Sequence, residues 1–464
     1  MVQKPKKVGI LAGGGPAPGI NAVIGAATIR AVLSGYDVVG INDGFKWLMK
    51  GDVDHTRKLS VDDVSRIHFR GGSFLGISRE NPTKKSELLE ATTVSLLRLE
   101  VDKLITIGGD DTAFSASRLE AQSKGRIRVV HVPKTIDNDL DLPESSDTFG
   151  FQTARHVGVE LVENLMVDAR TTSRWYFIVA MGRKAGHLAL GIGKAAGATV
   201  TLIPEELPEG PVRLQLVVDT LVGSIIKRLA AGRSDGAAIL AEGLVERIAE
   251  KDLEGMAGVE RDAHGHLRLA EVPFGDILKD RVTKRLAELG GAKVTIVAKN
   301  IGYELRCADP IPFDMEYARD LGYCAAKYLI EGGNAAMVSM CHATFRAIPF
   351  DSIMDRETGR VRVRMVDIHS DRYMIARRYM LRLRRDDLDD PSEIAKLAAV
   401  LGVSNERFEK ELGYLVEHEP IPRAFVDEYP STGLPPVVDP GPASAREAPP
   451  KGSVSSAPPK RRKH

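Results

Sequence analysis

The chain has 464 residues, 43% of them hydrophobic and 27% charged, which is typical of a globular enzyme with more than one domain. Its formal net charge of +1 excludes a global field that would attract nucleic acid or an anionic membrane, so an anionic ligand must be bound by locally placed cations. No apolar run approaches the roughly 20 residues of a membrane span, and the N-terminal apolar run passes into glycines without the pattern of a signal peptide.

Short β-branched runs alternate with longer helical patterns through the first part of the chain. Such alternation predicts parallel sheets that are covered by helices. We expect strands at Val8–Ala12, Tyr36–Ile41, Lys103–Ile107 and Ile127–Val132, and helices at Gly19–Leu33, Lys84–Glu100 and Thr112–Ala121.

The same alternation resumes after a break near Gly150. It therefore predicts a second α/β block that follows the first. We expect strands near Trp175–Ala180, Thr199–Ile203, Ala237–Leu240 and Val294–Ala298, and helices at Phe151–Ala169, Val212–Ala231, Phe274–Leu289 and Phe313–Glu331.

Glycines and aspartates gather where the predicted strands end. Ligands of open α/β sheets bind beyond these carboxyl ends. We therefore predict an α/β fold with two Rossmann-like parallel-sheet domains and an active site in the cleft between them. The predicted boundaries are residues 1–150 for the first domain, which residues from about 303 to 350 would complete, and residues 151–302 for the second.

The C-terminal part of the chain has a different composition. The stretch from Asp386 to Glu417 is amphipathic, so residues 351–429 are predicted to form a helical extension. Residues 430–464 are rich in Pro, Ser, Gly and Ala and are predicted to be a disordered basic tail. The run Arg382–Arg385 has no aromatic residue that would stack on a base, so it predicts a solvated helix face or an interface.

Three cysteines, Cys307, Cys324 and Cys341, are odd in number and lie at no metal-binding spacing. This usage is typical of a reducing compartment rather than of a disulfide scaffold. We therefore expect a cytoplasmic protein with neither a membrane nor a nucleic-acid partner.

The first glycine-rich loop runs from Gly13 to Gly19, after the first predicted strand and before the first helix. Its glycines let main-chain N–H groups approach an anion, and the helix N-terminus adds partial positive charge. It is not GxGxxG and no Walker lysine follows, so neither a dinucleotide site nor a P-loop is predicted. A tight turn that binds nothing remains an alternative.

The second loop, Gly108-Gly109-Asp110-Asp111-Thr112, follows the third predicted strand. Two glycines leave space for a ligand, and two carboxylates come directly after them. Asp110 is suited to Mg²⁺, which prefers carboxylate, water and phosphate oxygens. Asp111 or Thr112 is also expected to start the next helix, because both residue types are favoured at its beginning.

The third segment, Pro133–Asp139, combines a lysine, a hydroxyl and two carboxylates. Thr135, Asp137 and Asp139 would share one side if the segment were extended, because side chains of a strand alternate with period two. One carboxylate would then take a hydroxyl proton while the other organises metal or hydrogen bonds. A solvated acidic turn is the alternative.

These three loops, in this order, resemble motifs of the phosphofructokinase family. Three further motifs strengthen the resemblance, which covers roughly residues 8 to 350. The resemblance implies an Mg²⁺-dependent phosphotransferase that acts on the 1-hydroxyl of fructose 6-phosphate, with the first domain binding the phosphoryl donor and the second the sugar phosphate. The further motifs are Met181-Gly182-Arg183, Ala241-Glu242-Gly243 and Gly302-Tyr303-Glu304-Leu305-Arg306.

The resemblance also implies roles for individual residues. Asp137 would be the general base, and Thr135, Asp139 and Arg183 would complete the catalytic group. Tyr303 and Arg306 would bind the 6-phosphate. The implied substrate-binding residues are Gly15, Thr135, Asp137, Arg174, Met181, Gly182, Arg183, Glu242, Lys293, Tyr303 and Arg306; the implied donor-binding residues are Gly14, Gly15, Gly109, Asp110, Asp111 and Lys134, with Asp110 on the metal.

Arg174 resembles an arginine that family members lend to a neighbouring subunit, and Lys293 is a second candidate for this role. The resemblance therefore implies self-association into a homodimer or homotetramer. A homo-oligomer would then be part of the active site.

Two side chains bear on the choice of phosphoryl donor. ATP-using bacterial relatives normally have glycine at the position of Asp111, which leaves room for the α-phosphate of the nucleotide. Lys134 is typical of relatives that use pyrophosphate, where its charge would stabilise the leaving phosphate. Together they favour pyrophosphate over ATP, and an ATP-dependent kinase remains the alternative. A non-catalytic regulatory subunit is disfavoured, because Asp137, Asp139 and Arg183 are all present.

Overall fold

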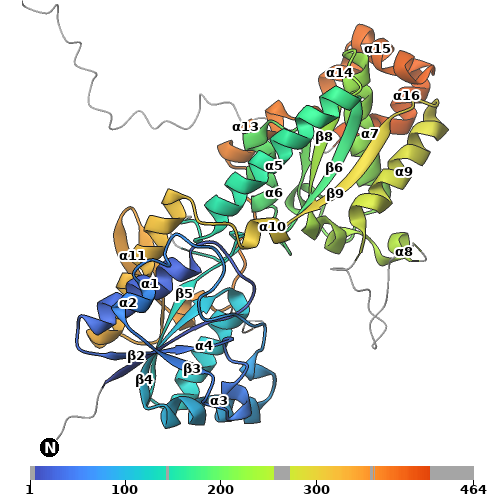
Figure 1. The fold of residues 1–464 in the computed structure, drawn as a ribbon. Coiled ribbons are helices and arrows are strands. Elements are labelled where there is room, and N and C mark those ends of the chain that lie inside the picture. Colours follow the sequence, from blue (N-terminus) through green and yellow to red (C-terminus); the bar gives the residue numbers. More distant parts are fainter. Residues whose placement is uncertain are drawn as a thin grey trace, which may run out of the picture. The chain divides into compact units, whose positions relative to one another are not determined.

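A seven-stranded sheet forms the core of the first lobe, in the order β11-β10-β5-β4-β1-β2-β3 (Figure 1). The structure is a computed structural model that describes residues 6–142, 146–254, 256, 272–355, 359 and 361–417. The five inner strands are parallel, and the edge strands β3 and β11 are antiparallel to their neighbours. The strands are β1 (Lys7–Ala12), β2 (Asp37–Ile41), β3 (Thr56–Leu59), β4 (Val101–Gly108), β5 (Arg128–Pro133), β10 (Ala336–Cys341) and β11 (Thr344–Pro349).

Both faces of this sheet are covered, as the uninterrupted apolar runs of its strands predict. Side chains alternate along β1, so Ile10 packs in one core cluster and Leu11 in another. The first cluster is closed by α1 (Ile20–Val32) and α11 (Pro312–Ile330), and the second by α3 (Ser86–Arg98) and α4 (Asp110–Ser123). Smaller elements of this lobe are η1 (Leu48–Lys50), α2 (Val61–Val64), η2 (Pro82–Lys84) and α12 (Phe350–Ile353).

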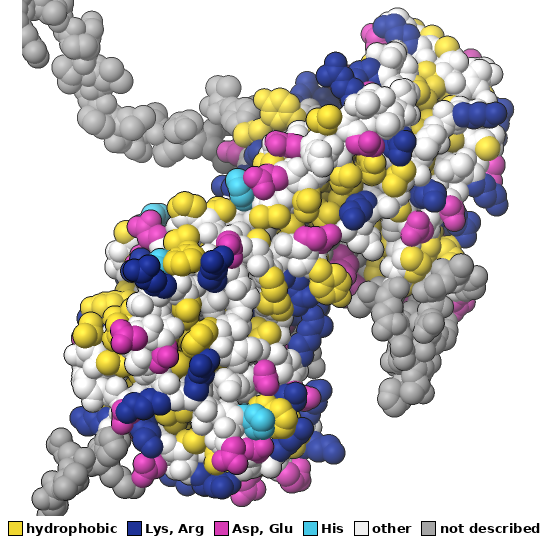
Figure 2. All heavy atoms as spheres, in the orientation of Figure 1, with side chains coloured by type: hydrophobic (Ala, Val, Ile, Leu, Met, Phe, Trp, Pro, Cys, Tyr) yellow, Lys and Arg dark blue, Asp and Glu magenta, His cyan; other side chains and the backbone are white. Residues whose placement is uncertain are grey.

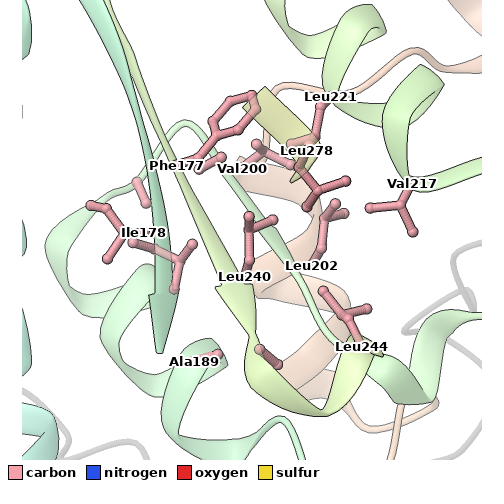
Figure 3. Packing of buried hydrophobic residues seen from close by; sticks show 14 of the residues in the cluster. Phe177, Ile178, Ala189, Val200, Leu202, Val217, Leu221, Leu240, Leu244 and Leu278 are labelled. Carbon is pink, nitrogen blue, oxygen red and sulfur yellow. The ribbon is translucent and has the colours of Figure 1, made fainter. Parts of the chain in front are cut away.

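The second lobe has a four-stranded parallel sheet in the order β7-β8-β6-β9. Phe177, Val200 and Leu240 come from three of its strands and lie side by side in the core (Figure 3). Burying side chains of this size stabilises the fold by about 1.5–3 kcal/mol each. The elements are β6 (Arg174–Ala180), β7 (Val200–Leu202), β8 (Gly236–Ala241), β9 (Thr295–Ile301), α5 (Phe151–Thr172), α6 (His187–Ala196), α7 (Leu214–Ala230), α9 (Phe274–Leu289), α10 (Tyr303–Arg306), η4 (Pro204–Glu206), η5 (Glu242–Arg247) and α8 (Glu250–Leu253).

The helices at the C-terminal end pack on the second lobe. Leu397 and Phe408 belong to the same core cluster as the four-stranded sheet. The run Arg382–Arg385 was expected to form a solvated helix face or an interface, and it is not solvated throughout. Arg382 is 5% exposed and contacts both carboxylate oxygens of Glu206 at 2.9 Å. The helices are α13 (Asp371–Tyr379), α14 (Arg385–Asp389), α15 (Pro391–Leu401), α16 (Asn405–Leu412) and η7 (Gly413–Val416).

The predicted α/β fold with two parallel-sheet blocks is confirmed, although the antiparallel edge strands β3 and β11 and the strand β10 were not expected. Helix α6 was also missed. The predicted tail at 430–464 lies outside the described residues. Among the residues that are described, no helix combines the length and apolar character needed to cross a bilayer. On the face shown in Figure 2, basic and acidic side chains are interspersed, in keeping with the net charge of +1.

Candidate active site

A pocket of about 370 Å³ lies where loops from the two sheets meet. The first sheet supplies the residues that follow β1, β4 and β5, and the second supplies those that follow β6, β8 and β9. These are the carboxyl ends of parallel strands, where ligands of α/β proteins bind. The predicted residues that line the pocket are Gly14, Gly15, Gly109, Asp110, Asp111, Lys134, Thr135, Asp137, Asp139, Met181, Arg183, Glu242, Tyr303 and Arg306.

The main chain of the first two loops is fixed at the sheet edge. The N–H of Lys134 donates to the Gly108 carbonyl at 2.8 Å, and the N–H of Gly13 donates to the Ile107 carbonyl at the same distance. His131 is fully buried, and its Nε2 donates to the same Gly108 carbonyl at 2.9 Å. Burial lowers the pKa of His131 to about 3, so the ring is neutral and holds the loop.

Helix α4 begins one or two residues earlier than predicted. Its N-cap is Gly109, and Asp110 and Asp111 both lie in the first turn, where carboxylates interact favourably with the helix dipole. Arg183 reaches across from the second lobe, and its Nη2 lies 3.0 Å from Oδ1 of Asp110. Because the N-cap is Gly109, the expectation that Asp111 or Thr112 starts the helix is wrong.

Lys134 is a buried cation of the first lobe. Its side chain is almost fully covered, and Nζ donates to the Gly15 carbonyl at 2.6 Å. The pKa of Lys134 is lowered to about 8: burial is the main cause and the nearby Arg306 adds to it, while Asp137 and Asp139 oppose the shift. The ammonium also lies beside Gly14: a Cβ on that glycine would be 3.7 Å from Nζ.

The segment after Lys134 is bent, so the condition of an extended segment, under which Thr135, Asp137 and Asp139 would share one side, is not met. Asn138 has a φ of 56°, in the left-handed region that Asn tolerates better than most residues. Asp137 and Asp139 nevertheless both line the pocket, together with Thr135, whose Oγ1 accepts a hydrogen bond from the N–H of Asp137 at 3.0 Å.

Both carboxyl groups of this segment bind protons more tightly than usual. Burial is the main cause that raises the pKa of Asp137, and Arg183 and Lys134 partly offset it. Burial also raises the pKa of Asp139, together with the charges of Asp137 and Asp110, to about 6. Two neighbouring carboxylates in a partly closed site are suited to exchange protons near neutral pH.

The second lobe contributes a turn and an acid. The main-chain N–H of Gly182 donates to Oε2 of Glu242 at 3.1 Å, which ties the turn after β6 to the start of η5. Gly182 itself does not line the pocket, whereas Met181, Arg183 and Glu242 do. The turn therefore presents its side chains while Gly182 supplies the backbone geometry, with a φ of 150°.

Arg306 is a buried cation of the second lobe's loops. It is 8% exposed, and its guanidinium makes no hydrogen bond or ion pair with the residues that the structure describes. Its guanidinium stacks near the Tyr303 ring, at 5.5 Å from the centroid, and lies against Gly15, where a Cβ would be 2.1 Å from Nη2. A buried guanidinium without a carboxylate partner favours binding of an external anion.

Two predicted residues lie away from the pocket. Arg174 begins β6, at the opposite end of that strand from Met181, and its Nε lies 3.9 Å from Oδ2 of Asp168. Lys293 is exposed and precedes β9, whose residue Thr295 pairs with Arg174. Both cations therefore lie at the amino end of the second sheet.

The sequence reasoning missed part of the pocket wall. Asn81 stands at the N-cap of η2, where its Oδ1 accepts from the Thr83 N–H at 2.8 Å, and Ser115 of α4 donates to the same oxygen at 3.3 Å. The cluster of charged and amide residues directly before Pro82 was the available signal. The missed lining residues include Phe45, Arg79, Glu80, Asn81 and Ser115.

Loops at the carboxyl ends of the parallel strands of both sheets enclose buried cations and carboxylates, an arrangement suited to an α/β enzyme that binds an anionic ligand. Residues 7–329 match the family model described as phosphofructokinase. The chain belongs to the phosphofructokinase family.

Named relatives agree with this assignment. The chain is 53% identical over 417 residues to the pyrophosphate–fructose 6-phosphate 1-phosphotransferase of Thermotoga maritima, a match that covers 89% of this chain and 99% of the relative. It is 47% identical over 425 residues to the protein of the same name from Naegleria fowleri, with coverage of 89% and 97%. A crystal structure of the pyrophosphate-dependent phosphofructokinase from Marinobacter aquaeolei has the same fold, with a TM-score of 0.61, 16% identity and coverage of 85% and 91%.

Proposed function

We propose that the chain transfers a phosphoryl group from pyrophosphate to the 1-hydroxyl of fructose 6-phosphate, giving fructose 1,6-bisphosphate and phosphate. The reaction runs in both directions and serves glycolysis or gluconeogenesis. The observation that carries this proposal is that Asp111 and Lys134 line the same pocket as Asp137. The names of the two relatives described above point to the same pair of substrates.

Pyrophosphate binds in the half of the pocket formed by the first lobe. The glycines of the first two loops let main-chain N–H groups approach its oxygens, and the Lys134 ammonium stabilises charge on the leaving phosphate. The exposed carboxylate of Asp111 lies where a longer polyphosphate would continue. Repulsion between two unit charges about 4 Å apart is roughly 1 kcal/mol in water and about 4 kcal/mol at an effective dielectric constant of 20.

Asp110 is the residue that holds Mg²⁺. Its side chain is 34% exposed at the pocket, next to Asp111, and within the described part of the chain no three or more acidic, histidine or cysteine side chains are arranged to hold a metal ion by themselves. This donor set fits Mg²⁺, which commonly binds one or two carboxylates and takes its other ligands from water and phosphate. When bound, the ion neutralises charge on the donor oxygens.

The sugar phosphate binds in the half of the pocket formed by the second lobe, which includes Arg306. The buried guanidinium of Arg306 binds the 6-phosphate with two parallel N–H donors, and Tyr303 lies beside it. Glu242 accepts hydrogen bonds from sugar hydroxyls, Met181 and Arg183 contact the sugar from the pocket wall, and Gly182 gives the turn its backbone geometry.

Asp137 takes the proton of the 1-hydroxyl as that oxygen attacks the phosphorus in line with the leaving phosphate. Burial keeps its pKa above the usual range of a carboxyl group, which makes it a stronger base than a surface aspartate. Thr135 and Asp139 line the path of the transferred group, and Arg183 balances its charge. Transfer is direct, without a covalent enzyme intermediate.

The active enzyme is a homodimer or homotetramer in the cytoplasm. Arg174 and Lys293 lie at the amino end of the second sheet, away from the pocket of their own chain. From this position they bind the substrate of a neighbouring subunit. Residues 1–150, completed by residues from about 303 to 350, bind the donor, and residues 151–302 bind the sugar phosphate together with Tyr303 and Arg306.

Phosphorus NMR tests the reaction itself. Fructose 6-phosphate, pyrophosphate and Mg²⁺ are incubated with the purified chain, and we expect loss of the pyrophosphate signal with equal gain of phosphate and of the 1-phosphate of fructose 1,6-bisphosphate. Starting from the bisphosphate and phosphate, the pyrophosphate signal should appear. Release of phosphate without a new sugar phosphate would overturn the proposal in favour of a pyrophosphatase.

A further inference from the structure

A segment of the C-terminal extension contacts the loop that carries the two pocket carboxylates. Val363 forms an antiparallel bridge with Leu140, and the main-chain N–H of Arg364 donates to the Asp139 carbonyl at 2.7 Å. Residues 363–366, here called the strap, therefore extend the backbone pairing of the carboxylate loop. The family match ends at residue 329, before the strap begins.

The Arg364 side chain holds the bend of this loop. Its Nη2 donates to Oδ1 of Asn138 at 2.6 Å and to the Asn138 carbonyl at 3.1 Å, and Nη1 donates to the Ser146 carbonyl at 3.1 Å. Asn138 is the residue with left-handed backbone between Asp137 and Asp139. Such a conformation costs free energy and persists only where its surroundings fix it.

The Asn138 side chain also makes hydrogen bonds with Asp147 and Thr148. Its Nδ2 donates to Oδ1 of Asp147 at 2.8 Å, and its Oδ1 accepts from the N–H of Thr148 at 3.0 Å. Arg364 is partly buried, and the carboxylates of Asp147 and Asp141 favour its charged form while burial opposes it. The guanidinium fork thus closes a network around the bend, and a point charge without the fork would not reproduce it.

The strap also contacts the second lobe. Nε2 of His187, the first residue of α6, donates to the Arg364 carbonyl at 3.1 Å. Oε1 of Glu205 accepts from the N–H of Val366 at 3.0 Å and from the N–H of Gly186 at 2.8 Å. Gly186 lies at the end of the turn that presents Met181 and Arg183, so the strap joins both walls of the pocket.

We infer that Arg364 is a positioning residue for phosphoryl transfer: it touches neither substrate but fixes the carboxylate loop in the geometry that the reaction needs. This inference rests on the proposed function for its kinetic consequence, whereas its structural consequence stands independently. A displacement of a catalytic group by about 1 Å lowers a rate by on the order of 100-fold. The binding groups Arg306 and Glu242 lie on other elements and would be unaffected.

The test compares Arg364→Ala with Arg362→Ala, a matched control two residues away. Arg362 is half exposed, pairs with Asp141 at 3.0 Å and contacts neither Asn138 nor Asp139. We expect Arg364→Ala to lower kcat by about 100-fold with KM for fructose 6-phosphate changed less than about threefold. Arg362→Ala should keep near wild-type kcat. Arg364→Lys should recover little, and millimolar guanidinium should restore part of the kcat of Arg364→Ala but not of Arg364→Lys.

Hydrogen exchange provides a readout that does not depend on the reaction. Amides of residues 136–142 and 146–150 should exchange at least about tenfold faster in Arg364→Ala than in Arg362→Ala, because local opening becomes easier. If the wild-type chain consumed no pyrophosphate, the proposed function would fail while this exchange test still decided the role of Arg364. Equal exchange in the two variants, or a loss of kcat that is matched by Arg362→Ala, would overturn the inference.

Discussion

At the level of single residues, burial and neighbouring charge decide which pocket groups hold a proton. Asp139 has its pKa raised to about 6, and the pKa of Asp137 is raised as well, while the pKa of Lys134 is lowered to about 8. Asp139 and Lys134 therefore titrate on either side of neutral pH. The pocket has the charges that the proposed transfer needs within that interval.

The pH profile of kcat/KM should accordingly be bell-shaped. As pH falls through about 6, Asp139 takes up a proton and the pocket loses that negative charge; as pH rises through about 8, Lys134 loses its positive charge. Initial rates measured between pH 4.5 and 10 in buffers of constant ionic strength check this. An acid limb below pH 4.5, where an exposed aspartate titrates, would contradict the role of burial.

Asp137→Asn should lower kcat by about 10²–10⁴-fold and leave KM for fructose 6-phosphate nearly unchanged, because the amide keeps the shape but accepts no proton. Steady-state kinetics measure both parameters. Asp141→Asn is the matched control on the same segment, since Asp141 is exposed and pairs with Arg362 rather than lining the pocket. A near-normal kcat for Asp137→Asn would dismiss it as the base.

Asp111→Gly should raise kcat/KM for ATP by at least about tenfold, because it removes both bulk and a negative charge from the path of a longer polyphosphate. The same substitution at the second position of another helix, Glu87→Gly in α3, controls for the loss of an acidic residue from a first turn. Coupled assays with each donor give the ratio. If ATP use does not improve, donor choice is determined by other residues.

At the level of elements, local patterns predicted most strands and helices because each carries its own period. Helix α6 escaped notice because glycines interrupt its sequence. The strand β10 pairs with β5, with Ala336 opposite Val130, and no local pattern reports a pairing between such distant segments. The ion pair between Arg382 and Glu206 could not be predicted for the same reason, because only the tertiary structure brings these two residues together.

The candidate site likewise combines residues that a local sequence pattern reveals with residues that only the tertiary structure brings together. Three of its loops were predictable from the sequence, because glycines next to carboxylates at the ends of predicted strands indicate a site for phosphate or metal even when the fold is unknown. Arg79 and Asn81 were not, since charged and amide residues before a proline are common in any surface loop. Arg364 could not be found either, because its role depends on a contact with Asn138 that is set by tertiary structure.

The C-terminal helices should be integral to the second lobe. Glu206→Ala would leave Arg382 and Arg377 without their carboxylate, and breaking a buried ion pair in this way costs about 3–5 kcal/mol. Urea unfolding, followed by Trp175 fluorescence in a Trp47→Phe background, reports on the second lobe, because the chain has 2 tryptophans and Trp175 is fully buried there.

The control for this unfolding experiment is Glu209→Ala. Glu209 is exposed, a few residues from Glu206, and its substitution should change the free energy of unfolding by no more than about 0.5 kcal/mol. Similar unfolding midpoints for the two variants would show that the C-terminal helices add little to this lobe.

At the level of the whole molecule, the position of Arg174 and Lys293 predicts a site shared between subunits. Arg174→Ala and Asp137→Asn should each be nearly inactive alone, yet co-expressed subunits should regain up to about a quarter of wild-type activity, because one site of each mixed dimer would be intact. Size-exclusion chromatography confirms the mixed species.

The control mixes Asp137→Asn with Asp139→Asn. Both residues belong to the same loop of one chain, so no combination of these subunits yields an intact site. Recovery of activity in this control, or none with Arg174→Ala, would refute a shared site.

The donor comparison addresses the whole account most directly. The purified chain is supplied with fructose 6-phosphate and Mg²⁺, and kcat/KM is measured separately for pyrophosphate and for ATP. We predict that pyrophosphate is preferred by on the order of 10²-fold or more, the result of about 3 kcal/mol of exclusion at Asp111. A kcat/KM for ATP equal to or above that for pyrophosphate would contradict the account.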